Sequence, residues 1–374
     1  MSGLDFVEDE LRELAAAGLL RSAAPACRLP GVLDFTSNDY LGLARRSVSR
    51  ETLLRHAGIA AGAAASRLIN GTHPQHDSLE SALAQWLRTD AALLFSSGYA
   101  ANIGVLSALA QAGDLIVSDS LNHASLIDGC RLSRATVRVV PHLDPLAVEQ
   151  ALSLPARRRY IVTESYYSMD ADTPNLRRLR TLADSYNAAL IVDEAHALGV
   201  FGPQGRGICA REGVTPDLLI GTLGKALGLH GAFVAGSAAL RTYLWNRARS
   251  FVFSTAPLPL LASLATSHVL YARRANQARQ HLAACAARLR SRLAPTPIAP
   301  PPTSHGPIIP LIVGTPAAAL DAAQRLLARG IRVQPIRPPT VPHGTSRLRI
   351  TLSAANTSAQ VDRLADTLLQ TCAP

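Results

Sequence analysis

The fold of this chain is decided by residues 190–199, which read LIVDEAHALG. The run begins with three β-branched or large apolar residues and has no polar alternation. That pattern is typical of a strand buried on both faces, as in a parallel sheet. The apolar run stops at Asp193, and His196 follows three residues later. In an open parallel sheet, ligands bind beyond the carboxyl ends of the strands, so the stretch predicts both a buried strand and one edge of a site.

The tetrapeptide Asp-Glu-Ala-His also occurs in nucleic-acid helicases, and the net charge of +10 fits a nucleic-acid binder. Such a motor needs a phosphate loop of the form G-x-x-x-x-G-K-[ST]. The lysine of this chain lies in GTLGKALG (221–228) and is followed by Ala226, so the loop is absent from the sequence. The arginines are dispersed, which favours a solvated surface. A nucleic-acid binder stays the alternative from another class, but no nucleic-acid partner is expected.

One lysine, Lys225, stands among the 37 lysines and arginines of the chain. Arginine replaces lysine readily where only surface charge is needed. It cannot replace a primary amine that must lose its proton and attack a carbonyl. The sequence therefore raises the hypothesis that Lys225 is a nucleophile, against the plainer interpretation that one lysine was retained by chance.

Six further apolar runs predict strands: 91–95, 115–119, 137–140, 160–164, 218–222 and 231–236. Helical patterns lie between them, which indicates an α/β domain with a mostly parallel seven-stranded sheet. An Arg- and Ala-rich helical stretch follows from about residue 240 to 293, and a smaller C-terminal α+β domain ends the chain. We expect an N-terminal helix and extended segment over 1–45, a large domain over 46–262 and a small domain over 263–374.

Chemically useful side chains follow the ends of these strands. Besides Asp193, His196 and Lys225, they are His123, Glu164, Ser168, Thr222 and the helix start Ser97-Gly98-Tyr99. An aldehyde cofactor with a phosphate and a ring nitrogen needs such a set. It needs an amine, a carboxylate against the ring nitrogen, a flat partner for the ring and helix-start N–H groups for the phosphate. Lys225, Asp193 and His123 meet the first three needs, which predicts pyridoxal 5'-phosphate.

Seven motifs in order resemble those of the α-oxoamine synthases, a family of fold-type I pyridoxal-phosphate enzymes. They are FTSNDYLGLA, LFSSGYAANIGVLSAL, DSLNHASLIDG, VTESYYSMDADTPNL, LIVDEAHALGVFGPQGRG, GTLGKALGLHGAF and FSTAPLP. The resemblance covers about residues 33–369. It implies a decarboxylative condensation of an amino acid with an acyl thioester, in a homodimer with shared active sites.

The resemblance also implies individual roles. Lys225 holds the cofactor covalently and moves protons at the substrate α-carbon, Asp193 pairs with the pyridine nitrogen, His196 pairs with the ring hydroxyl, and His123 stacks on the ring. The remaining cofactor contacts are expected from Ser97, Gly98, Tyr99, Glu164, Ser168 and Thr222, with Ser254 or Thr255 supplied by a second subunit. The substrate contacts are expected from Arg21, Asn38, His123, Thr340 and Arg349, with Arg349 for the amino-acid carboxylate.

Residues 336–357, IRPPTVPHGTSRLRITLSAANT, most resemble the branch that acts in biotin synthesis. That branch condenses L-alanine with pimeloyl-CoA, or with the pimeloyl carrier protein; the two donors stay open. The alternative is a sister enzyme that condenses glycine with acetyl-CoA. In residues 60–65 alanines stand where the family often has glycines, and because alanine disfavours positive φ, this loop is expected to follow a different path.

Other features are less informative. The cysteines are scattered without a C-x-x-C pair, and the N-terminus has acids where a signal peptide has basic residues, so a cytoplasmic protein without membrane spans is expected. His73 and His76 are interpreted as part of a loop and helix start, with no metal site expected. GRGICA (205–210) is interpreted as a surface turn, and Glu194 as uninformative.

Overall fold

The computed structural model describes residues 3–21, 31–47 and 49–372, and its contacts divide the chain into two units. The first unit contains Met1–Asn38, Ser168–Ala171 and His281–Pro374. The second contains Asp39–Tyr167 and Asp172–Gln280. The predicted limits of 1–45, 46–262 and 263–374 stay a prediction, and the contacts divide the chain differently.

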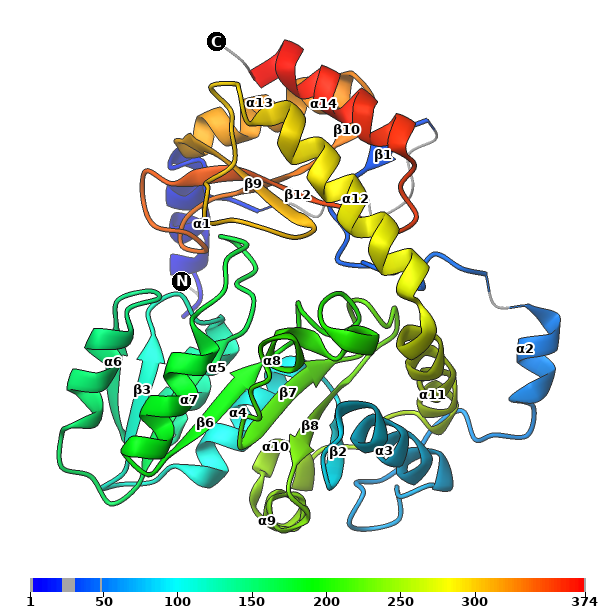
Figure 1. Ribbon diagram of the computed structural model, residues 1–374, viewed down its shortest axis with the longest axis vertical. Coiled ribbons are helices and arrows are strands. Elements are labelled where there is room, and N and C mark those ends of the chain that lie inside the picture. Colours follow the sequence, from blue (N-terminus) through cyan, green and yellow to red (C-terminus); the bar gives the residue numbers. More distant parts are fainter. Residues whose placement is uncertain (1–2, 22–30, 48, 373–374) are drawn as a thin grey trace. The chain divides into compact units, whose positions relative to one another are not determined.

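The second unit is built on a seven-stranded sheet (Figure 1). Its strands are β2 (Ala91–Phe95), β3 (Leu115–Asp119), β4 (Thr136–Val140), β5 (Arg159–Glu164), β6 (Ala188–Asp193), β7 (Leu218–Thr222) and β8 (Ala232–Gly236), in the order β2-β8-β7-β6-β5-β3-β4. Strand β8 runs antiparallel to both its neighbours, and the pairs from β7 through β4 are parallel. The seven strands predicted from apolar runs are confirmed, with ends within one residue.

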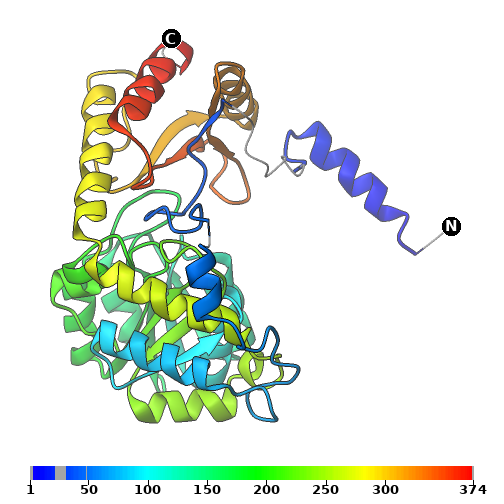
Figure 2. The same cartoon turned by 90° about the vertical axis from the view of Figure 1, so that its right-hand side faces the viewer.

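Helices cover both faces of this sheet (Figures 1 and 2). The helices of this unit are α3 (Pro74–Leu87), α4 (Gly98–Leu109), α5 (Ala124–Leu132), α6 (Pro145–Leu152), α7 (Leu176–Ser185), α8 (Gly207–Glu212), α9 (Ala238–Arg247), α10 (Arg249–Val252) and α11 (Pro259–Arg274). Helix α2 (Arg50–Arg55) belongs to the same unit but stands apart from the sheet in Figure 1. The core on one face packs strand residues such as Ile191 and Ile220 against Val105, Leu106 and Leu126 of α4 and α5. Burial of these apolar side chains is the main stabilising term.

The first unit contains a three-stranded antiparallel sheet and a short parallel pair. The sheet has the order β11 (Gln334–Ile336), β12 (Ser346–Thr351), β9 (Ile308–Gly314), and the pair joins β1 (Leu33–Asp34) to β10 (Ile331–Arg332). Helix α13 (Pro316–Ala328) contacts all three strands of the sheet, and α14 (Ser358–Cys372) contacts α13. Helix α12 (Asn276–Leu293) begins in the second unit and ends in the first.

The predicted N-terminal amphipathic helix exists as α1 (Phe6–Ala16), but none of its residues is buried. The predicted helical stretch 240–293 is divided into α9, α10, α11 and α12. Within the described ranges, no helix is both long and apolar enough to span a bilayer.

Two short segments, at residues 73–76 and 205–210, lead into helices of the second unit. His73 and His76 do form a helix start: the His73 backbone N–H donates to His76 Nδ1 at 3.1 Å, at the first turn of α3. The surface-turn interpretation of 205–210 is wrong, because Gly205, Gly207, Ile208 and Cys209 are buried. The segment forms the start of α8, and the cause of its burial is Glu194, described below.

Candidate active site

The carboxyl ends of three neighbouring parallel strands bring the predicted cofactor residues of the second unit together. Glu164 and Asp193 are register partners at the ends of β5 and β6, and Lys225 comes three residues after β7 ends. Both acids are buried, with Glu164 4% and Asp193 7% exposed. Lys225 is close enough to act electrostatically on Glu164 and on His123. The sheet therefore collects an amine and two acids at one edge.

Hydrogen bonds fix the Asp193 carboxylate. Its Oδ1 accepts from the Ala195 backbone N–H at 2.8 Å, and its Oδ2 accepts from Asn102 Nδ2 at 2.9 Å. Asn102 also donates to Ser125 Oγ at 2.8 Å, while its own Oδ1 is buried without a partner among the described residues. Sequence reasoning missed Asn102; the available signal was a lone amide inside the apolar helix α4, one turn after Gly98.

His196 is positioned by a residue that the sequence analysis did not select. Its Nδ1 lies 2.7 Å from the hydroxyl of Tyr40, and both side chains are buried. The two rings meet edge to face with centroids 6.2 Å apart. Tyr40 belongs to the quoted motif FTSNDYLGLA. Nothing in the sequence, however, indicated a contact with a residue 156 positions later.

His123 begins helix α5 and is attached to the same edge. Its backbone N–H donates to Glu164 Oε1 at 2.7 Å, and its Nδ1 accepts from the Ser125 N–H at 3.2 Å. Burial lowers the pKa of His123, Asp193 opposes that shift, and Lys225 adds to it. Burial and then the charge of Asp193 raise the pKa of Glu164 to about 8. The ring of His123 is therefore neutral at pH 7, which suits a flat contact with an aromatic ligand.

The start of α4 has the features of an anion site. Ser97 caps the helix, its Oγ accepting from the Ala100 N–H at 3.1 Å. A Cβ added to Gly98 would meet no described atom within 4 Å, so the first turn faces open space. Tyr99 donates its hydroxyl to Asp128, and that bond raises the Tyr99 pKa. Free N–H groups and the helix dipole at such a start favour a phosphate.

Thr222 serves the turn that leads to Lys225. Its hydroxyl donates to the Gly231 carbonyl at 3.1 Å and accepts from the Gly224 N–H at 3.1 Å. Thr255, expected to act from a second subunit, bridges to Ser66 in its own chain through the backbone. The phosphate roles of Thr222, Ser254 and Thr255 stay predictions.

The Ala-rich loop that leads to Ser66 departs from ordinary alanine geometry. Ala64 has φ of +58°, in the left-handed region that favours glycine. An alanine there costs roughly 1–2 kcal/mol. The backbone at Ala64 therefore adopts a conformation that suits glycine better than alanine.

Four of the five predicted substrate residues lie in the first unit, and the fifth, His123, lies in the second. Arg349 is buried, and its guanidinium donates to the Ser168 carbonyl at 2.6 Å, Asn38 Oδ1 at 3.0 Å and Thr351 Oγ1 at 3.0 Å. These contacts use three of the five N–H groups of a guanidinium, which leaves two for a carboxylate. The structure therefore joins Arg349, Asn38 and Ser168, and Ser168 contributes its carbonyl to the group.

Arg21 and Thr340 form a second pair in the first unit. Arg21 donates to Thr340 Oγ1 at 2.9 Å. The pair borders a cavity of about 680 Å³ lined by the end of α1, by α13 and by β11. Arg332 and Arg337 also line it, and no acid does among the described residues. A cavity with this lining suits an apolar chain that ends in an anion.

Glu194, interpreted as uninformative, is fully buried and structural. Its Oε2 accepts from the Ile208 N–H at 3.0 Å, and its Oε1 accepts from the Cys209 N–H at 2.6 Å. A Cβ added to Gly207 would lie 2.1 Å from Glu194 Oε2, so glycine is needed there. The acid thus satisfies the free N–H groups at the start of α8 and holds that turn inside the protein.

Comparison with known proteins gives a consistent result. Residues 30–368 match the family model described as aminotransferase class I and II. An 8-amino-7-oxononanoate synthase of Anaeromyxobacter dehalogenans is 45% identical, covering 96% of this chain and 93% of that protein. A crystal structure of an 8-amino-7-oxononanoate synthase from Francisella tularensis matches with a TM-score of 0.79 at 25% identity, covering 91% of this chain and 97% of the other.

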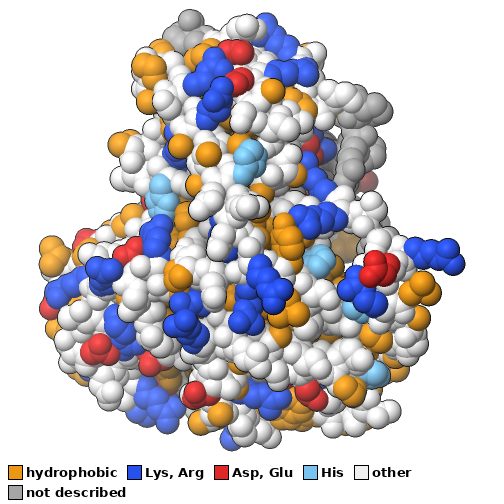
Figure 3. All heavy atoms as spheres, turned by 45° about the vertical axis from the view of Figure 1, so that its right-hand side comes forward, with side chains coloured by type: hydrophobic (Ala, Val, Ile, Leu, Met, Phe, Trp, Pro, Cys, Tyr) orange, Lys and Arg blue, Asp and Glu red, His pale blue; other side chains and the backbone are white. Residues whose placement is uncertain are grey.

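A serine palmitoyltransferase from S. paucimobilis, solved with a bound PLP–myriocin aldimine, matches with a TM-score of 0.90. It is 26% identical, and the match covers 98% of this chain and 97% of the other. The predicted fold type is therefore confirmed. A nucleic-acid binder would be expected to gather its arginines on one surface. On the face seen in Figure 3 the arginines are scattered among other side chains.

Proposed function

This chain belongs to the 8-amino-7-oxononanoate synthases of the class I and II aminotransferase family, and from that membership we propose how its own residues carry out the reaction. The enzyme is a pyridoxal-phosphate-dependent acyltransferase of biotin synthesis. It condenses L-alanine with a pimeloyl thioester and releases carbon dioxide and the free thiol. The sister reaction of glycine with acetyl-CoA is not favoured, because relatives at 43–45% identity are named 8-amino-7-oxononanoate synthase.

The residues present fit pyridoxal 5'-phosphate. The open first turn of α4 suits the phosphate, Asp193 suits a protonated ring nitrogen, and Lys225 is the single amine side chain of the chain. When bound, the cofactor supplies an electron-poor ring that stabilises negative charge at the amino-acid α-carbon. The observation that carries the assignment is the Asp193 carboxylate, held by Asn102 and the Ala195 N–H at the end of β6, next to the strand that precedes Lys225.

The proposed roles follow from these contacts. Lys225 Nζ holds the cofactor in the resting enzyme and takes the proton from the alanine α-carbon. Asp193 would place its carboxylate against the ring nitrogen, and its two hydrogen bonds keep that carboxylate oriented. His123 covers the ring face as a neutral imidazole. His196, oriented by Tyr40, pairs with the ring hydroxyl.

Substrate binding is assigned to the first unit. Arg349 binds the alanine carboxylate with the two N–H groups that its own contacts leave over, and Asn38 and Ser168 hold the guanidinium plane. Arg21, next to Thr340, binds the far carboxylate of the pimeloyl chain. CoA and an acyl carrier protein are both compatible with this arrangement, and a homodimer that completes each phosphate site with Ser254 or Thr255 is part of the proposal.

The test is a substrate panel. Purified enzyme with added cofactor is assayed with L-alanine or glycine against pimeloyl-CoA, pimeloyl carrier protein and acetyl-CoA, and product and free thiol are measured. Alanine with a pimeloyl donor is expected to have the highest kcat/KM. A higher kcat/KM for glycine with acetyl-CoA would overturn the substrate assignment. Borohydride reduction of the loaded enzyme should modify the peptide with Lys225, and a label elsewhere would overturn the role of that residue.

A further inference from the structure

A cluster of one histidine and two acids, His142, Asp119 and Asp172, lies at the same strand edge of the second unit. The reaction outlined above does not use it. His142 follows β4, and its two ring nitrogens point at two different acids. Nδ1 lies 2.8 Å from Asp119 Oδ1, and Nε2 lies 3.2 Å from Asp172 Oδ2. A neutral imidazole has one N–H and could donate to only one of these acids. The geometry therefore describes an imidazolium between two carboxylates.

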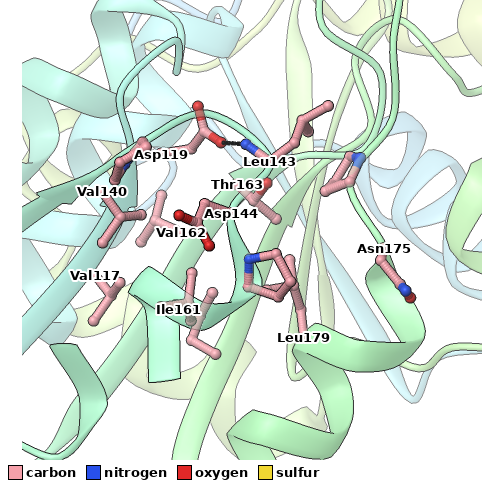
Figure 4. A pocket seen from close by; sticks show the side chains of 14 residues that line it. Val117, Asp119, Val140, Leu143, Asp144, Ile161, Val162, Thr163, Asn175 and Leu179 are labelled. Carbon is pink, nitrogen blue, oxygen red and sulfur yellow. Dashed lines mark hydrogen bonds between the residues drawn. The ribbon is translucent and has the colours of Figure 1, made fainter. Parts of the chain in front are cut away.

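Each acid belongs to a loop that carries a residue of the candidate site. Asp119 ends β3 and accepts from the Leu121 N–H at 2.8 Å, inside the short turn that leads to His123. Its other oxygen accepts from the Leu143 N–H at 3.0 Å, a contact drawn in Figure 4. Asp119 thus ties the turn before His123 to the loop that carries His142.

Asp172 closes a loop on the other side of His142. The Tyr167 N–H donates to the Asp172 carbonyl at 3.0 Å, and Tyr167 meets the His142 ring edge to face with centroids 4.5 Å apart. The four residues between them, Ser168–Ala171, belong to the first unit. There the Ser168 carbonyl accepts from Arg349, and Asp170 accepts from Arg347 at 2.7 Å. His142 therefore holds together both ends of the loop that orients Arg349.

The cluster is not itself a binding site. The neighbouring cavity, shown in Figure 4, has a volume of about 20 Å³, close to what one water needs. Its walls are mainly apolar, with Val117, Val140, Ile161 and Val162 among them. Substrate does not fit there, so the cluster acts through the loops that it holds.

We infer that His142 is a positioning residue for the reaction, acting as a cationic clamp on two loops. Through Asp119 it sets the turn that presents His123, and through Asp172 it sets the loop whose Ser168 carbonyl orients Arg349. This inference rests on the proposed roles of His123 and Arg349. It assigns separate consequences to the two arms: the Asp172 arm governs alanine binding, and the Asp119 arm governs the surroundings of the cofactor.

The experiment compares His142→Gln, Asp172→Asn and Asp119→Asn with the matched control Asp114→Asn. Asp114 precedes the other end of β3, is also buried, and is ion-paired with Arg157 at 2.8 Å. The measurements are KM for alanine, kcat, the absorption spectrum of the bound cofactor, the thermal midpoint and amide exchange of the peptide 166–173 in apo-enzyme. All four variants are expected to lower the thermal midpoint.

Asp172→Asn and His142→Gln are expected to raise KM for alanine about 10-fold, with kcat within about threefold, because a carboxylate-binding group held loosely loses orientation. Both should speed exchange in 166–173, and Asp119→Asn should shift the cofactor spectrum. Asp114→Asn should do none of these. A KM and an exchange rate for Asp172→Asn equal to those of Asp114→Asn would overturn the inference.

Failure of the proposed function would look different. If wild-type enzyme did not use alanine, the roles of Arg349 and His123 would fall, while the exchange rates and the spectrum would still decide whether His142 clamps the two loops. If His142→Gln failed to fold, Asp172→Asn would carry the test alone, because it keeps the cation and removes only one charge.

Discussion

His123 and His142 follow neighbouring strands of one sheet, and each lies near two acids, yet their pKa values move in opposite directions. Burial lowers the pKa of both. At His123 the charge of Asp193 opposes the effect of burial, but the charge of Lys225 adds to it, so the pKa falls. At His142 direct hydrogen bonds to Asp119 and Asp172 outweigh burial and raise the pKa to about 10. Hydrogen-bond geometry, more than the number of nearby charges, therefore separates a reactive region from a structural one.

The largest expected effect tests the reactive side of this comparison. Lys225→Ala removes the amine that holds the cofactor and moves the substrate proton, so turnover should fall by roughly 10⁴-fold or more. The measurement is product formation under saturating alanine and thioester. Lys225→Arg, which keeps the charge but not the reactive amine, is the matched control and should be almost as inactive. Substantial turnover by either variant would mean that the chemistry lies elsewhere.

Asp193→Asn and Asp119→Asn compare the two regions directly. Asp193→Asn removes the charge against the ring nitrogen and should lower kcat/KM by roughly 10²–10³-fold. Asp119→Asn removes one arm of the His142 clamp and should lower kcat/KM by no more than about 10-fold. Steady-state kinetics give kcat/KM for both variants. An equal loss of kcat/KM in the two would contradict the distinction between the regions.

The stability supplied by His142 should depend on pH. Its folded pKa of about 10 lies above the ordinary value of 6.5, so the protonated form is favoured in the native state. The contribution is complete below about pH 6.5 and is lost as pH rises toward 10. Urea unfolding should show His142→Gln less stable than wild type by about 2–4 kcal/mol at pH 6, with the difference shrinking steadily up to pH 10. A difference that stayed constant over this range would rule out an imidazolium.

The smallest expected effect concerns Glu194, the buried acid that follows Asp193. Glu194→Gln removes one of the two acceptors that hold the start of α8, which should cost about 1–2 kcal/mol of unfolding free energy. KM and kcat should stay within about twofold of wild type, because Glu194 faces backbone N–H groups of its own chain. A large loss of activity at unchanged stability would assign Glu194 to the reactive region instead.

The strands and the strand-end residues were predictable because both depend on local sequence. Continuous apolar runs mark buried parallel strands, and the polar residue after each run must lie at the carboxyl edge. Asp193, Lys225 and Glu164 were found in this way. Lys225 was easy to select as the amine because every other Lys or Arg position of the chain is an arginine.

The contacts that tune the site were not predictable, because they join residues far apart in sequence. Tyr40 reaches His196, and His142 reaches Asp172, only after the sheet has formed. Glu194 and the segment 205–210 were each misinterpreted for one reason. Acids and glycine-rich turns are usually exposed, so the sequence favoured an exposed position for both. In the interior the Glu194 carboxylate accepts from backbone N–H groups of the turn, so each satisfies the polar groups of the other.

The pairing of β1 with β10 has a consequence for synthesis on the ribosome. Leu33 lies opposite Ile331, about 300 residues later in the chain. At 5–20 residues per second, β1 waits roughly 15–60 s before its partner strand exists. The sheet of the second unit is translated in full within that interval, since β8 ends at Gly236. The nascent protein is therefore expected to form its cofactor-binding unit first. Strand β1 stays without its partner strand until the last quarter of the chain has been synthesised.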